Sequence, residues 1–214
     1  ERLLAAGDAG PVAVGVDERH ARGLALRRLA DAVVEDLDAV ALPETAWSGS
    51  PAARRWWKAL TLRFGHPAWV HVRQPAPGVV HAEIACGGEV VAWAVEADAG
   101  DAVAFAALAA VAAAQARAAG AAVPTGPVTL SGAAPVWRPS DADTVAWSAG
   151  WDWPAGAGAA EDGLQQALRS LPQLSRAAVW TVDGAAAEDG LTEQAAQLRR
   201  ALGAVGFTVV RWAS

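Results

Sequence analysis

The chain has 214 residues, with 17 basic and 23 acidic side chains and a formal net charge of −6. No basic run exceeds an arginine pair, so we expect no nucleic-acid partner, which would need clustered cations to displace counterions from phosphates. The longest apolar stretch, residues 102–114, is shorter than the ~20 residues of a membrane crossing, so we expect no membrane association. The single cysteine, Cys86, excludes an internal disulfide and predicts a cytoplasmic protein.

The first elements predicted along the chain are a strand and an amphipathic helix. Residues 11–16 combine β-branched side chains with Gly and Pro punctuation, which favours a short buried strand. Asp17 is a suitable N-cap for a helix over residues 18–37. Its apolar positions recur at three- and four-residue steps, and they are Leu26, Leu29, Val33 and Leu37. Arg27 and Asp31, four residues apart, are expected on the opposite, polar side.

A short helix and three strands follow. Ser50 and Pro51 resemble a cap and a first-turn proline, which predicts a helix over residues 51–60. The strands are expected at 68–73, 79–86 and 90–96, separated by a turn at 74–78 and by a Gly-Gly pair at 87–88. Short turns between successive strands predict an antiparallel meander.

An alanine-rich helix over residues 101–119 is expected next, ended by Gly120 in the position where helices commonly turn left-handed. The periodicity then disappears over residues 121–160, which are rich in Trp, Gly and Pro, with short strand candidates at 128–130 and 135–138. This segment is either a long functional loop or a boundary.

The last third regains periodicity and predicts helix, strand, helix and strand at residues 161–170, 176–182, 188–202 and 207–212. A strand–helix–strand sequence of this spacing favours a right-handed parallel crossover. We therefore predict an α+β protein, in which an antiparallel meander packed with helices is followed by a C-terminal β-α-β unit. Its parts are an α+β body (1–120), an irregular segment (121–160) and an α-β-α-β unit (161–214) that packs on the same body.

The histidines are the first candidates for catalysis or metal binding. If the turn at 74–78 is symmetric, His71 and His81 face each other across the hairpin, and Glu83 lies on the same side of the sheet two residues on. Two imidazoles and a carboxylate could form a catalytic or metal site. The commoner role of such residues is a solvated strand face, and the sequence has no complete nucleophile or phosphate-loop motif. We therefore expect neither a cofactor nor a bound metal.

Four tryptophans in the irregular segment are the candidates for partner binding: Trp137, Trp147, Trp151 and Trp153. They either pin this segment to the body or form a surface for a protein or peptide partner, because Trp is enriched where interfaces bury their anchors.

Two segments carry a family resemblance. Residues 15–35 begin with a glycine, followed by a spacer and an acidic helix, and residues 96–117 form a helix that ends with Gln115 and Arg117. Together they resemble the YcaO-like proteins, ATP-using enzymes that make azoline heterocycles and related backbone changes in ribosomal peptides. The resemblance spans roughly residues 11–118 and places the family's acidic positions, in degenerate form, at Asp31 and Glu35.

The departures from the family change the function that the resemblance implies. Ala112 stands where the family has a Glu that binds nucleotide and magnesium, and the serine of the first helix is missing. Because Mg²⁺ requires oxygen ligands, the resemblance implies a non-catalytic YcaO-like partner in ribosomal-peptide modification that binds a peptide or a partner enzyme. The alternatives are an enzyme with a histidine and carboxylate site, or an unrelated subunit of a permanent homo- or hetero-oligomeric complex.

Overall fold

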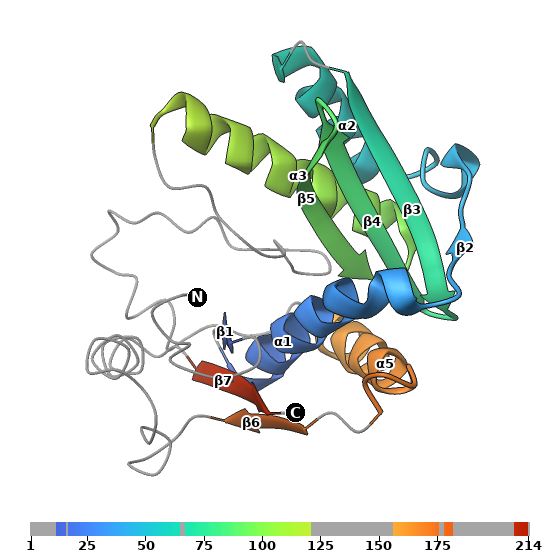
Figure 1. Cartoon of the computed structure of the whole chain (residues 1–214), viewed down its shortest axis with the longest axis vertical. Coiled ribbons are helices and arrows are strands. Elements are labelled where there is room, and N and C mark those ends of the chain that lie inside the picture. The colour runs from blue at the N-terminus through green and yellow to red at the C-terminus, as the bar shows by residue number, and fades with distance from the viewer. Residues whose placement is uncertain are drawn as a thin grey trace.

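The protein is an α+β structure, as the sequence predicts. The computed structural model describes residues 12–15, 17–64, 67–120, 156–175, 178–181 and 208–213. A four-stranded antiparallel sheet with two helices forms one part, and two further helices and a three-stranded sheet lie beside it (Figure 1).

The four-stranded sheet has the order β2-β3-β4-β5, with β2 at Val40–Ala41, β3 at Ala68–Ala76, β4 at Val79–Cys86 and β5 at Glu89–Glu96. The last three strands form the predicted antiparallel meander. The connection between β3 and β4 is shorter than expected, because β3 continues to Ala76 and only Pro77 and Gly78 turn the chain. Gly78, with φ 73°, supplies the left-handed conformation that this tight turn needs.

Helices α2 (Pro51–Phe64) and α3 (Ala99–Ala118) cover one face of this sheet. Alternate strand residues, among them Val72, Ala82 and Ile84, enter the core that the two helices share with the sheet. Helix α3 begins after the side-chain cap of Asp98 and is long and apolar enough to span a membrane by composition alone. Most of that stretch is buried inside this core, which accounts for its apolar character.

Helices α1 (Glu18–Val33) and α5 (Ala157–Arg169) cover one end of the opposite face. They bury a leucine-rich cluster against Val79 and Val95. Asp17 caps α1 as predicted, accepting a hydrogen bond from the backbone N–H of His20 at 2.7 Å. The expected polar position of Arg27 is wrong, because its side chain is fully buried and ion-paired between α1, β5 and α5.

A second, three-stranded sheet has the order β1-β7-β6, formed by Val12–Gly15, Thr208–Ala213 and Ala178–Thr181. The predicted parallel crossover is wrong for these strands, because β6 and β7 pair antiparallel. Strand spacing alone did not fix the direction of pairing, since a connection as long as residues 182–207 can return the chain in either direction. The predicted helix at 188–202 and the strand candidates within 121–160 lie outside the described residues.

Candidate functional site

The face of the meander opposite α2 and α3 carries the polar residues that the sequence singled out. The observed register pairs His71 with Glu83 and Arg73 with His81. The predicted pairing of His71 with His81 is wrong by two residues, because the tight turn at Pro77 and Gly78 and an irregularity after Arg73 shift the alignment. A shift of two preserves the face, so these four residues still share one side of the sheet.

His81 is held in place from α1 and from β5. Its ring is only 1% exposed, and its Nε2–H donates to the Asp31 Oδ1 atom at 2.8 Å. The Trp93 ring stacks on it with centroids 6.3 Å apart. The other nitrogen, Nδ1, is buried and has no hydrogen-bond partner within the described part of the chain. An ionised carboxylate only accepts hydrogen bonds, so the contact with Asp31 places a ring proton on Nε2.

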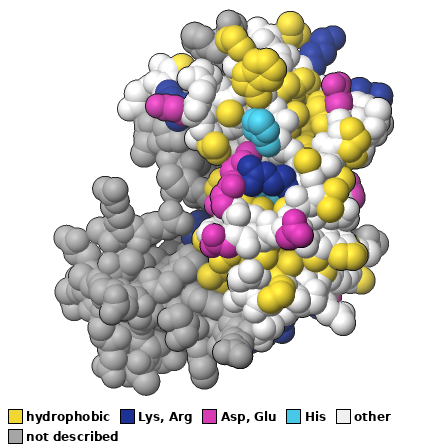
Figure 2. Space-filling view, turned by 45° about the vertical axis from the view of Figure 1, so that its right-hand side comes forward, with side chains coloured by type: hydrophobic (Ala, Val, Ile, Leu, Met, Phe, Trp, Pro, Cys, Tyr) yellow, Lys and Arg dark blue, Asp and Glu magenta, His cyan; other side chains and the backbone are white. Residues whose placement is uncertain are grey.

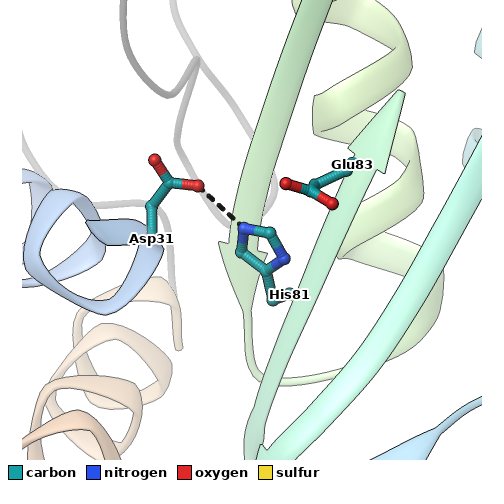
Figure 3. Close-up of side chains that lie close together, drawn as sticks. All are labelled: Asp31, His81 and Glu83. Atoms are coloured by element: carbon teal, nitrogen blue, oxygen red, sulfur yellow. Dashed lines mark hydrogen bonds and ion pairs between the residues drawn. The ribbon is translucent and has the colours of Figure 1, made fainter. Parts of the chain in front are cut away.

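Glu83 lies next to His81 on the same face of β4, as Figure 3 shows. One oxygen of its carboxylate is 3.4 Å from Arg73 Nη2, while Arg73 Nη1 donates to Glu35 in a second ion pair. Figure 2 shows histidine, basic and acidic side chains gathered near the middle of this face, bordered by hydrophobic side chains. We call Asp31, His81 and Glu83 the carboxylate–histidine cluster; one ligand atom from each lies within 4.8 Å of the others.

A second feature is the incompletely paired edge of β3. Strand β2 covers only one end of it, pairing Val40 with Gln74 and Ala41 with Arg73, and the Leu42 N–H donates to the Val72 carbonyl at 2.8 Å. Residues two apart on a strand direct their backbone groups to the same edge. The N–H and C=O groups of Val70 and Ala68 therefore point to this edge, where the described residues provide no partner strand.

An apolar groove adjoins the open edge. It has a volume of about 330 Å³ and is lined by Leu42, Glu44, Trp47, Trp57, Ala68, Trp69 and Val70. Trp69 is 63% exposed, whereas Val72 and Ile84 of the same sheet are buried. Strand β2 ends just here, because residues 44–46 form a short 3₁₀ helix directly after Pro43. Edge, groove and exposed indole are thus contiguous.

The positions implied by the family resemblance fall in two separate places. Asp31 belongs to the carboxylate–histidine cluster and Glu35 pairs with Arg73, whereas Gln115 and Arg117 are exposed near the end of α3. Arg117 lines an open cavity of about 410 Å³ with Cys86 at the far end of β4. Cys86 is five positions from His81 along β4, or about 16 Å of extended chain. Burial raises the pKa of the Cys86 thiol, which disfavours the thiolate.

A buried charge network fixes α1 against the rest of the structure. Arg27 binds the Glu161 carboxylate through two hydrogen bonds of 2.8 Å, and binds Glu96 at 3.1 and 3.2 Å. Gln165 donates a further hydrogen bond to Glu161 at 2.9 Å. Burial raises the pKa of Glu96 to about 7, against the opposing effect of Arg27. Burial also opposes ionisation of Glu161, but its hydrogen bonds and the charge of Arg27 outweigh this and lower the pKa of Glu161.

No known protein family matches the chain, and no curated protein or solved structure shows significant similarity to it. The four candidate partner-binding tryptophans (Trp137, Trp147, Trp151 and Trp153) lie outside the described residues. The polar face and the open edge of β3 are therefore the features that indicate a function.

Sequence reasoning found His81 and Glu83 but missed their partners. Asp31 comes from a helix fifty residues away, and nothing in the local pattern connects it with β4. The groove tryptophans, Trp47, Trp57 and Trp69, were also missed, because they come from three separate segments. The sequence contains one signal for the groove. Alternate side chains of a half-buried strand are expected to be polar, and Trp69 occupies such a position in β3.

Proposed function

We propose that this chain is a non-catalytic binding protein that holds an extended peptide segment of a partner along the open edge of β3. The observation that carries the proposal is the juxtaposition of unpaired backbone groups, at Val70 and Ala68, with the tryptophan-lined groove. Peptides commonly bind by adding a strand to such an edge, with the main chain giving affinity and side-chain pockets giving specificity.

Strand β2 already demonstrates how this edge is used. Its residues run antiparallel to β3 and end at the Leu42 contact with Val72. A peptide that continues in line with β2 meets the N–H and C=O of Val70, then those of Ala68. Four backbone groups contribute only a few kcal/mol, at roughly 1 kcal/mol for each net hydrogen bond. The groove must therefore supply much of the binding free energy.

The groove defines the side chain that the peptide needs. Val70 lies on the side of β3 that packs toward α2, and a peptide residue opposite it directs its side chain to the same side. There it meets Trp47 and Trp57, whose rings are in edge contact at 5.9 Å between centroids. A large apolar side chain fills this space, whereas a charged one loses its hydration without gaining a partner. The preferred peptide is thus extended, with one aromatic or leucine side chain at this position.

A binding role of this kind is the one that the YcaO-like resemblance implies, and on that reading the natural peptide is a ribosomally made substrate of a partner enzyme. The same edge could instead pair with a second copy of this chain, as expected for a subunit of a permanent complex. Exposed apolar edges are prone to such pairing. The two occupants are distinguished by the oligomeric state of the purified protein.

The test is a selection from a displayed library of random linear peptides, followed by titration of the selected peptides. We expect selected peptides to share one large apolar residue and to protect the Val70 N–H from hydrogen exchange. Val70→Pro removes the donor that faces the open edge, while the ladder between β3 and β4 keeps its bonds. It should weaken peptide binding by about tenfold or more, equivalent to ~1.4 kcal/mol.

The matched controls concern the groove. Trp69→Ser should weaken peptide binding. Leu62→Ser, which removes another exposed apolar side chain from α2 outside the groove, should not. Failure to select any peptide, or selected peptides that bind Val70→Pro and wild type equally, would overturn the proposal. If the purified protein is a stable dimer and Trp69→Ser dissociates it, the occupant of this edge is a second copy of the chain and not a peptide.

A further inference from the structure

We propose that the carboxylate–histidine cluster binds a divalent first-row transition-metal ion, with Asp31, His81 and Glu83 as its protein ligands. The site is separate from the peptide-binding edge and does not depend on it. It also differs from the metal arrangement considered from the sequence, since Asp31 of α1 takes the place expected for His71.

The geometry brings three ligand types of the right kind together. His81 and Glu83 are two residues apart on β4 and so share a face, and α1 brings Asp31 to the same point (Figure 3). Ligand atoms bound to one ion at ~2.1 Å lie roughly 3 to 4 Å from one another. The three ligand atoms already lie within 4.8 Å of each other, so small side-chain rotations bring them onto one ion.

The buried imidazole is the independent observation that points to a ligand. His81 is 1% exposed, one nitrogen is tied to Asp31, and the other has no partner among the described residues. An ion shared with Asp31 binds Nε2, the nitrogen that faces Asp31, and displaces the proton held there, so that the neutral ring carries its proton on Nδ1.

The local charge balance also suits a dication. Asp31, Glu35 and Glu83 are three carboxylates, and within the part of the chain that the structure describes their ion pairs involve only Arg73 and the His81 ring. With a neutral ring, three negative charges against one positive leave a formal surplus of two. A divalent ion neutralises that surplus. Arg73 can release Glu83 to it, because that contact is long at 3.4 Å, and keep its closer partner, Glu35.

The ligand set indicates the class of ion. An imidazole favours zinc and its neighbours over Mg²⁺ and Ca²⁺, which take oxygen ligands almost exclusively. Three protein ligands leave a coordination position of a four-coordinate ion for water. The proposal therefore predicts preference for Zn²⁺ or Co²⁺ over Mg²⁺.

The experiment is a titration of the chelator-treated full chain with Zn²⁺ by calorimetry and with Co²⁺ by visible absorption. We expect one ion per chain, with at least about tenfold weaker binding in Glu83→Gln and in Asp31→Asn. His81→Gln should abolish Zn²⁺ binding. Because His81 is buried, this substitution can unfold the protein, and in that case Glu83→Gln and Asp31→Asn decide the result. Arg73→Gln removes the competing cation and should tighten binding several-fold.

Two matched variants distinguish Zn²⁺ binding at this cluster from adventitious binding at other side chains. Glu89→Gln removes an exposed carboxylate from the neighbouring strand, and His71→Gln removes the exposed histidine that the sequence suggested. Both should bind Zn²⁺ as tightly as the wild type. No stoichiometric binding, or equal affinity in the wild type, Glu83→Gln and Asp31→Asn, would refute the proposal.

Discussion

Replacing Glu96 with glutamine should remove a specific pH dependence of stability. Glu96 is 1% exposed and shares the Arg27 guanidinium with Glu161. One guanidinium faces two carboxylates, and the closer hydrogen bonds go to Glu161. Burial therefore dominates at Glu96 and raises its pKa to about 7 from the ordinary value of 4.5. Glu96→Gln keeps the shape and removes the ionisation.

The sign of this pH dependence follows from the number of protons that the folded and unfolded states bind. Above pH 4.5 the unfolded chain releases the Glu96 proton, while the folded chain keeps it until about pH 7. The folded state then binds more protons, so the contribution of Glu96 to stability is lost as pH rises between these values. A shift of about 2.5 pH units at 1.36 kcal/mol each gives about 3 kcal/mol. Burial lowers the pKa of His20 below 6.5, so the contribution of His20 makes stability rise with pH just below that value. This effect is the same in the wild type and in Glu96→Gln.

The assay is urea unfolding followed by tryptophan fluorescence at pH 4.5 and pH 8. Relative to the wild type, Glu96→Gln should gain up to about 3 kcal/mol in free energy of unfolding between the two pH values. Glu89→Gln, in which an exposed carboxylate is lost, should follow the wild type. A Glu96→Gln curve parallel to the wild-type curve would falsify the reasoning, since Glu96 would then ionise in the folded state as it does in the unfolded chain.

Three further predictions concern the helix α1 and the nucleotide site implied by the family resemblance. Gly23→Ala should lower the free energy of unfolding by about 2 kcal/mol or more, measured by urea titration, because a Cβ there would lie 1.8 Å from the buried Glu161 Oε1 atom. Asp17→Ala removes the α1 cap and should cost about 1 kcal/mol in the same assay. Mg²⁺-ATP should leave the thermal midpoint unchanged, because Ala112 supplies no carboxylate for Mg²⁺.

Local patterns predicted the elements well where one rule dominated. The Asp17 cap, the strand of Val79–Cys86 and the left-handed Gly120 after α3 are set by neighbouring residues, and all three were predicted. The alignment of β3 with β4 was not, because a proline–glycine turn and an irregularity decide it, and both depend on how the two strands pack. The predicted face of each side chain was still correct, because the error in the alignment was an even number of residues.

The candidate site was predictable only in the part that lies on one strand. His81 and Glu83 share a face because side chains two residues apart on a strand always point to the same side. The position of Arg27 was predicted wrongly, because a charged side chain within a helix normally faces water unless distant carboxylates pair with it. Glu96 and Glu161 are those carboxylates, and both lie far along the chain.

Helix α1 connects the buried charge network with the carboxylate–histidine cluster. Arg27 and Asp31 are one helical turn apart, and the first is fixed by the buried charge network while the second holds the His81 ring. The network therefore sets the depth at which Asp31 meets the sheet. An apolar anchor in its place would also bury α1, but it would leave the helix free to slide along the sheet by a fraction of a turn. Hydrogen bonds of fixed direction restrict such sliding, and a three-residue ligand cluster shared between a helix and a strand requires that restriction.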